Sequence, residues 1–141
     1  EYRRNPDATH KSVWGAWSAT GARAYVDGEC YFWFVGRADS EIISAGYRIS
    51  PFEVESALVE HPAVAEAAVV AKGDPMRGTI VKAYVILAPG HEASEALATE
   101  LQDHVKKVTA PYKYPREVEF VTELPKTISG KIRRVELPGE N

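Results

Sequence analysis

Two apolar, β-rich runs constrain the fold of this chain more than any other feature. They cover residues 64–71 and 80–87, and the segment 74–78, with the turn-forming sequence Asp-Pro-Met-Arg-Gly, lies between them. Short runs rich in Val and Ile that end at Pro, Gly and Asp are typical of β-strands. A third β-rich segment follows at residues 117–121. Together the three segments predict a three-stranded sheet.

Two helices are predicted to cover this sheet. The first begins at residues 50–53 (Ser-Pro-Phe-Glu), where Ser caps the helix, Pro occupies its first turn and Glu lies three residues after the cap. It ends at residues 61–62 (His-Pro). The second helix spans about residues 94–108 and carries an apolar face. From Glu41 onward we therefore expect an α+β unit in which both helices lie on one face of the sheet.

Shorter signals surround this unit. Residues 42–43 and 47–49 predict a small hairpin, and residues 24–26 and 31–35 predict another one around an Asp-Gly-Glu turn. The second hairpin is rich in aromatic residues, and a lone hairpin of this kind needs a partner surface for stability. Near the C-terminus, residues 131–135 predict a last short turn of helix.

Composition and charge exclude several classes of protein. The net charge of −3 gives no overall basic footprint for nucleic acid, and no apolar run approaches the ~20 residues of a membrane-spanning helix. A single cysteine, Cys30, excludes an internal disulfide and fits a reducing compartment. The four histidines lack the spacing of metal ligands, so no metal site is predicted.

Residues 104–134 differ from the rest of the chain in charge. They hold eight Lys or Arg against three Glu, a local balance of +5. This balance is typical of a surface that attracts an anionic cosubstrate such as a nucleotide. The alternative is a solvated basic face without a ligand.

The polar loop Pro-Lys-Thr-Ile-Ser-Gly-Lys at residues 125–131 is the strongest single pointer to chemistry. Gly130 allows the backbone to turn where a side chain would clash. Lys131 then projects a compact cation on a long stem, which suits delivery of charge to a phosphate or a carboxylate. The alternative is a solvated loop lysine, because short motifs match by chance.

Further motifs occur upstream in a fixed order. Thr20-Gly21 is followed by Gly-Arg-Ala-Asp at residues 36–39 and by Ser-Ala-Gly-Tyr-Arg-Ile-Ser-Pro-Phe-Glu-Val-Glu at residues 44–55. With the loop at residues 125–131, this order resembles the C-terminal part of the adenylate-forming acyl-CoA synthetases, most closely their medium- and short-chain branch. The resemblance runs from about the first residues to Val135. The Ser/Thr/Gly-rich phosphate loop of that family is absent from the sequence.

The resemblance implies a domain organisation and a reaction. Residues 1–38 would be the trailing segment of a large N-terminal domain together with the hinge, and residues 39–141 a small C-terminal domain. The reaction would convert a carboxylic acid, ATP and coenzyme A, with Mg²⁺ bound in the N-terminal domain, into acyl-CoA, AMP and pyrophosphate. Such an enzyme fits fatty acid metabolism. We expect a cytoplasmic location, with the mitochondrial matrix as the alternative, and the oligomeric state is left open.

The resemblance also assigns roles to residues of the adenylation half-reaction. Lys131 matches the adenylation lysine, and Asp39 matches the hinge on which the small domain rotates. Arg37 matches the arginine that contacts the ribose of the nucleotide. The alternative for Arg37 is an ion pair with Asp39 or Glu41.

A second set of residues matches the thioester half-reaction. Ala45, Gly46 and Tyr47 match the loop that lines the pantetheine tunnel, although they also form the turn of the predicted hairpin. Arg48 matches a contact to the nucleotide phosphate, or else it only coats the sheet. Lys106 lies where some relatives hold a basic residue against the coenzyme A phosphate, but it also suits the C-terminus of a helix.

One departure from the family puts nucleotide binding in question. The family usually reads Thr-Gly-Asp, whose carboxylate accepts hydrogen bonds from the ribose, whereas this chain has Ala22 in place of Asp. Loss of a charged acceptor costs about 1.5–3 kcal/mol. Either ATP binds weakly, or Asp27 compensates, or the sequence is altered or degenerate.

Two other functions remain open. The same hinge and lysine occur in adenylation domains that load a carrier protein, and a non-catalytic interaction module would retain the fold and tolerate Ala22. The sequence argues against a P-loop NTPase, because the residues around Lys131 lack the upstream glycine and the Ser or Thr after Lys. The isolated chain is expected to be inactive, since the phosphate loop and the acyl pocket are missing.

Overall fold

A computed structural model describes residues 3–38 and 40–139 of the chain. The chain divides into two compact units, Glu1–Ser40 and Glu41–Asn141. No helix among the described residues is long and apolar enough to cross a bilayer.

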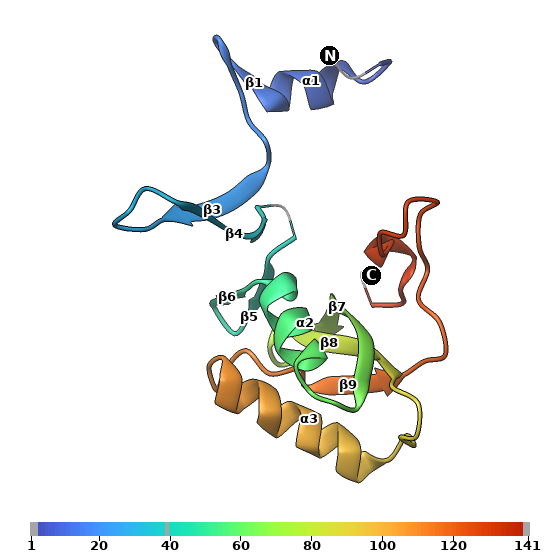
Figure 1. The fold of residues 1–141 in the computed structure, drawn as a ribbon. Coiled ribbons are helices and arrows are strands. Elements are labelled where there is room, and N and C mark those ends of the chain that lie inside the picture. Colours follow the sequence, from blue (N-terminus) through green and yellow to red (C-terminus); the bar gives the residue numbers. More distant parts are fainter. Residues whose placement is uncertain (1–2, 39, 140–141) are drawn as a thin grey trace. The chain divides into compact units, whose positions relative to one another are not determined.

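The first unit contains one short helix and two small antiparallel hairpins (Figure 1). The aromatic hairpin predicted around the Asp-Gly-Glu turn is present as two paired strands. A short helix and another hairpin precede this aromatic hairpin. They were not predicted, because each spans too few residues to show a periodic pattern of apolar side chains. The Asn5 side chain caps the helix by accepting a hydrogen bond from the Ala8 N–H. In chain order the elements are α1 (Pro6–Ser12), β1 (Val13–Trp14), β2 (Trp17–Ser18), β3 (Ala22–Val26) and β4 (Phe32–Arg37).

The second unit is the predicted α+β structure. Its sheet has the strand order β7-β8-β9, in which β7 and β8 are antiparallel and β8 and β9 are parallel, so α3 serves as the crossover between the parallel strands. The β5–β6 hairpin precedes the first helix. In chain order the elements are β5 (Ile42–Ser44), β6 (Tyr47–Ile49), α2 (Pro51–Val59), β7 (Val64–Asp74), β8 (Gly78–Leu87), α3 (Glu95–Val108), β9 (Glu117–Phe120) and the 3₁₀ turn η1 (Arg134–Glu136).

Several boundaries differ from the prediction in an instructive way. Strands β7 and β8 extend to the tip of their hairpin, because the Asp74 carboxylate accepts hydrogen bonds from the Met76 and Arg77 N–H groups and closes a tight turn. Ser50 stands at the N-cap of α2 but makes no capping hydrogen bond with its side chain. The helical turn expected at residues 131–135 is a 3₁₀ turn that begins only at Arg134.

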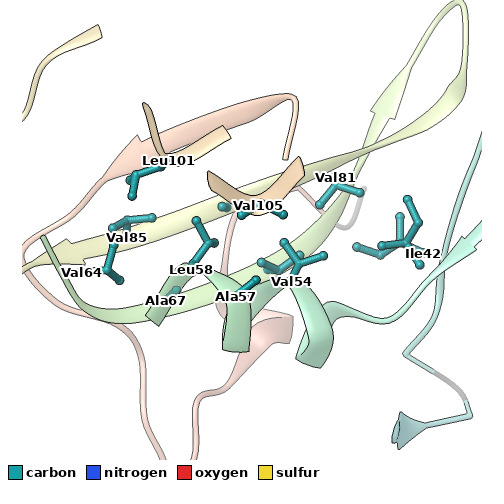
Figure 2. Close-up of a cluster of buried hydrophobic side chains, with 13 residues drawn as sticks. Ile42, Val54, Ala57, Leu58, Val64, Ala67, Val81, Val85, Leu101 and Val105 are labelled. Carbon is teal, nitrogen blue, oxygen red and sulfur yellow. The ribbon is translucent and has the colours of Figure 1, made fainter. Parts of the chain in front are cut away.

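The main core lies between the two helices and one face of the sheet. Leu58 of α2 and Leu101 and Val105 of α3 are fully buried against Val81 and Val85 of β8. Figure 2 shows these side chains gathered between the helices and the strands, with Ile42 of the β5–β6 hairpin at one end of the cluster. This arrangement confirms the prediction that both helices cover the same face.

The opposite face of the sheet carries a second core that the sequence did not predict. Val70 and Tyr84 point to this face because they alternate with the residues of the main core. Leu124 and Leu137, from the segment after β9, bury them. Gly139 lies so close to β7 that a Cβ atom there would sit 3.1 Å from Val70 Cγ2. The C-terminal segment is therefore a structural layer of the unit.

Candidate functional site

The Lys131 loop is a tight excursion from the C-terminal layer. An isolated β-bridge joins Lys126 to Ile132. Above the bridge, the Thr127 N–H donates to the Lys131 carbonyl at 2.8 Å, and the Lys131 N–H donates to Thr127 Oγ1 at 3.1 Å. Gly130 adopts a φ of +82°, which is favourable for glycine, and its N–H donates to the Thr127 carbonyl at 2.9 Å. The backbone of Lys131 is thus held on both sides.

The Lys131 side chain, by contrast, is exposed. Among the residues that the structure describes, its ammonium group has no hydrogen-bond or ion-pair partner. A fixed backbone beneath a cation that no neighbour neutralises is the arrangement expected of a group that meets an anionic ligand.

The Gly46 turn joins β5 to β6 in two residues. Ser44 pairs with Tyr47, and both central residues lie in the left-handed region, Ala45 with φ of +48° and Gly46 with φ of +84°. These signs define a turn of type I′, which matches the twist of the flanking strands. The Tyr47 ring stacks on Tyr112, with centroids 4.4 Å apart. Ala45, Gly46 and Tyr47 are all exposed, so the turn presents its backbone to solvent.

The other two predicted cations of this unit are engaged in local contacts. Arg48 Nη1 lies 3.2 Å from Glu41 Oε2, and the Arg48 side chain is mostly exposed. Lys106 Nζ lies 2.7 Å from Asp103 Oδ1 and 4.4 Å from the centroid of the Tyr114 ring. The Lys106–Asp103 pair is exposed on both sides, and such pairs contribute about 0–1 kcal/mol, so Lys106 can exchange Asp103 for a ligand. In the other pair only Arg48 is exposed, since the Glu41 side chain is 15% exposed.

The structure separates Lys131 from the Gly46 turn. The β5–β6 hairpin is attached through Ile42 and Ile49 to the main core, whereas the Lys131 loop is attached through Ile132 to the second core on the opposite face of the sheet. Figure 1 shows the hairpin and the C-terminal excursion at different places of the unit. Ala45, Gly46, Tyr47 and Arg48 lie together on the hairpin, and Lys131 does not join them.

In the first unit, Arg37 lies next to the Thr-Gly-Ala segment. Ala22 and Arg37 are cross-strand partners at the end of the β3–β4 ladder. The Ala38 N–H donates to the Gly21 carbonyl at 2.8 Å, and the Ala22 N–H donates to Thr20 Oγ1 at 3.2 Å. Two segments that the sequence assigned separately to nucleotide binding thus meet at one point. The predicted hinge residue, Asp39, lies outside the described residues.

The Asp27 carboxylate, the alternative acceptor for the ribose, is engaged in hydrogen bonds within its own turn. Its Oδ1 accepts hydrogen bonds from the Glu29 and Tyr31 N–H groups, both at 3.0 Å, and its Oδ2 accepts one from Trp33 Nε1 at 2.6 Å. The hydrogen bond from Trp33, followed by that from Tyr31, lowers the pKa of the Asp27 carboxyl. The carboxylate is therefore occupied within its own turn, at the opposite end of β3 from Ala22.

Two contacts near these residues were missed at the level of sequence. Tyr112 stacks on Tyr47 from the loop after α3, and Glu55 of α2 binds Arg134 beyond the Lys131 loop. A local pattern cannot reveal either pair, because the partners are far apart in the chain. The sequence offered one signal that Glu55 could be buried. It lies on a short predicted helix next to the apolar residues Val54 and Ala57.

Comparison with known proteins places this geometry in context. The AMP-binding enzyme C-terminal domain family matches residues 53–131. The chain is 61% identical over 136 residues to acyl-coenzyme A synthetase ACSM4, mitochondrial, of Mus musculus, covering 95% of this chain and 23% of that protein. It is 56% identical over 138 residues to the mouse acyl-coenzyme A synthetase ACSM3, mitochondrial, covering 96% of this chain and 24% of that protein.

A solved structure gives the same result. The crystal structure of the anthranilate CoA ligase AuaEII in complex with anthranoyl-AMP matches with a TM-score of 0.83 at 45% identity, covering 94% of this chain and 26% of that one. The chain therefore spans about a quarter of the length of the proteins it matches. The expectation of a cytoplasmic location is wrong, because the related synthetases ACSM3 and ACSM4 are mitochondrial proteins.

Proposed function

This chain belongs to the family of AMP-binding enzyme C-terminal domains, and from that premise we propose that it forms the C-terminal part of an ATP-dependent acyl-CoA synthetase of the medium-chain type. The observation that carries the proposal is the identity of 56–61% to such synthetases over nearly the whole chain. The exposed Lys131, on a loop whose backbone is hydrogen-bonded to Thr127, is the feature of the fold that suits the chemistry of such an enzyme.

The proposed reaction has two halves. In the first, a carboxylate oxygen attacks the α-phosphorus of ATP, an acyl-adenylate forms and pyrophosphate leaves. In the second, the thiol of coenzyme A attacks the acyl carbon, its proton is lost, and AMP leaves with the electrons of the broken acyl–phosphate bond. Charge moves between carboxylate and phosphate oxygens in the first half, whereas the second half needs a narrow passage for a thin thiol arm.

Lys131 is proposed to act in the first half. Its ammonium would bridge the oxygens of the carboxylate and the α-phosphate as negative charge is redistributed between them. The support is geometric, since the cation is exposed while the hydrogen bonds to Thr127 fix its backbone. Preorganisation of this kind lowers the cost of reorienting a charge during the reaction.

The face that carries Ala45, Gly46 and Tyr47 is proposed to act in the second half. A turn without a side chain at Gly46 lets the pantetheine arm approach the backbone closely. Arg48 and Lys106 would bind phosphate groups of the nucleotide and of coenzyme A after releasing Glu41 and Asp103. Because this face and Lys131 belong to opposite sides of one sheet, the domain would present one of them at a time.

The same proposal assigns the remaining residues. Residues 1–38 would belong to the large N-terminal domain and the hinge, and residues 39–141 would form the domain that rotates at Asp39. The exposed aromatic side chains of the first unit support this division, since large uncovered apolar surfaces mark interaction sites. These aromatic side chains include Trp14, Trp17, Phe32 and Phe34. In the same unit, Arg37 would contact the ribose of the nucleotide.

Cofactor and location follow from the same premise. Among the described residues, no group of three or more His, Cys, Asp or Glu is arranged to hold a metal ion. From the family resemblance we propose that the Mg²⁺ that accompanies ATP binds in the N-terminal part of the synthetase. We also propose that the protein is mitochondrial, as ACSM3 and ACSM4 are.

The test is an assay of a full-length synthetase that carries this chain as its C-terminal part. With ATP, Mg²⁺, coenzyme A and a medium-chain fatty acid, we expect acyl-CoA and one pyrophosphate per turnover. Loading of a phosphopantetheine carrier protein in place of free coenzyme A would favour the carrier-loading alternative. Absence of any acyl-adenylate would favour the non-catalytic module, for which Ala22 is the specific support.

A further inference from the structure

We propose that Glu55 is a positioning residue for Lys131 and that it acts through Arg134. The proposal rests on the proposed role of Lys131 in adenylation. It concerns an ion pair between helix α2 and the residue that follows the Lys131 loop by three positions.

The Glu55–Arg134 pair has the geometry of a rigid joint. Arg134 Nε donates to Glu55 Oε1 at 2.9 Å, and Arg134 Nη2 donates to Glu55 Oε2 at 2.6 Å. Glu55 Oε1 also accepts a hydrogen bond from the Val69 N–H of β7 at 2.8 Å. Only 11% of the Glu55 side chain is exposed. A two-point contact between a planar guanidinium and a buried carboxylate fixes orientation as well as distance.

This joint is connected to Lys131 by a short and ordered path. Arg133 precedes Arg134 and donates its N–H to the Pro125 carbonyl at 2.8 Å. Ile132, one residue earlier, packs on the second core and pairs with Lys126. The next residue is Lys131, whose backbone is bonded to Thr127. A displacement of Arg134 would therefore act on a short segment whose residues are hydrogen-bonded or packed up to the base of the loop.

The other end of the loop has a weaker anchor. Lys126 Nζ lies 2.7 Å from Glu66 Oε2, but about two fifths of each side chain is exposed, at 38% and 41%. Water and salt screen such a pair, whereas the nearly buried Glu55 is screened much less. Of these two ion pairs at the ends of the loop, Glu55–Arg134 is therefore the one less screened by solvent.

Stability alone does not account for a charged pair at this place. Well-packed apolar residues of similar volume are often as stabilising as a buried ion pair, because burial of two charges costs solvation. An apolar contact, however, lacks the direction of a two-point hydrogen bond. What the pair provides beyond an apolar contact is a defined path for the chain that leads away from Lys131.

The test compares variants of a full-length synthetase that carries this chain. Glu55→Gln keeps an acceptor for the Val69 N–H but removes the charge, and Arg134→Lys keeps the charge but removes the two-point contact. We expect each to lower kcat of acyl-adenylate formation by about tenfold or more, since small misplacements of a reacting group have effects of this size. The conversion of supplied acyl-adenylate and coenzyme A to thioester should not change.

A matched control and a double variant separate positioning from general structure. Glu117→Gln also removes a carboxylate that forms ion pairs on this unit, with Lys72 and Lys82, and it should leave both half-reactions unchanged. In a Lys131→Ala background, Glu55→Gln should cause no further loss of adenylation, because two residues that act through one group are not additive. If Glu55→Gln fails to fold by circular dichroism, Arg134→Lys carries the test.

Each contrary outcome has a distinct meaning. If Lys131→Ala leaves adenylation intact, both the proposed function of Lys131 and the role of Glu55 are overturned. If Lys131→Ala slows adenylation while Glu55→Gln and Arg134→Lys do not, only the positioning role is overturned. Equal losses in both half-reactions, or a further loss in the Lys131→Ala background, would identify the ion pair as a structural element and overturn the proposal.

Discussion

Ala22 lies directly opposite Arg37 in the β3–β4 ladder. Cross-strand partners in an antiparallel pair point their side chains to the same face. The position at which the family resemblance implies a ribose-binding carboxylate is therefore next to the arginine proposed to contact the same ribose.

The first prediction follows from this pair. Ala22→Asp in a full-length synthetase should tighten ATP binding by roughly tenfold or more, which corresponds to the 1.5–3 kcal/mol of a hydrogen bond to a charged group. Isothermal titration calorimetry of both forms measures the change. Ala16→Asp, which adds the same charge to an exposed turn of the same unit, is the control. Unchanged affinity in Ala22→Asp would mean that another residue already holds the ribose.

The parts of the fold that were predictable are those with a local pattern. The long apolar runs of β7 and β8 and the apolar face of α3 can be recognised in the sequence, because burial places apolar residues in runs or at regular spacing. The cover of the second face could not be predicted. It consists of isolated residues, Leu124 and Leu137, in a segment whose regular structure is limited to a β-bridge and a 3₁₀ turn, and only the folded chain brings them to the sheet.

The same distinction applies to the candidate site. Lys131 was predictable as an exposed cation, since Gly130 and the polar residues before it define a loop. The contact that orients the loop was not predictable, because Glu55 and Arg134 are 79 residues apart in the chain. Pairing over such a distance depends on how α2 packs against β7, which no local pattern records.

Asp39→Pro tests the hinge. Proline fixes φ near −65° and so restricts a residue that must change its backbone angles when the domain rotates. In a full-length synthetase we expect this variant to impair one half-reaction much more than the other. Separate measurements of pyrophosphate release and of thioester formation from supplied acyl-adenylate provide the comparison. Equal losses in the two would show that rotation does not occur at Asp39.

Glu117 should make the second unit sensitive to acid. Hydrogen bonds from Lys72 and then Lys82 lower the pKa of its carboxyl from the ordinary value of 4.5. A group with a lowered pKa in the folded state stabilises that state above its unfolded pKa, and this contribution is lost as the pH falls through the folded pKa. The effect is moderated by solvent, since 36% of the side chain is exposed.

Urea unfolding of the chain between neutral pH and pH values below 4.5 measures this contribution. The free energy of unfolding should fall on acidification, and it should fall less in Glu117→Gln, which has no proton to take up. Glu92→Gln, an exposed carboxylate outside the ion-pair network, should retain the wild-type pH dependence. If Glu117→Gln and the wild type lose stability in parallel, the ion pairs of Glu117 do not contribute to folding.

Lys131→Ala is the decisive test of the proposed mechanism. Removal of a preorganised charge at the reacting phosphate should slow acyl-adenylate formation by about 10²–10³-fold, or about 2.7–4 kcal/mol. Thermal stability should barely change, because an exposed side chain without partners among the described residues contributes little packing. The variant should still convert supplied acyl-adenylate and coenzyme A to thioester, since that half-reaction is proposed to use the face that carries Gly46. Acetylation of Lys131 should reproduce the substitution, because it removes the same charge. A variant that loses both half-reactions equally, or neither, would exclude Lys131 as the adenylation lysine.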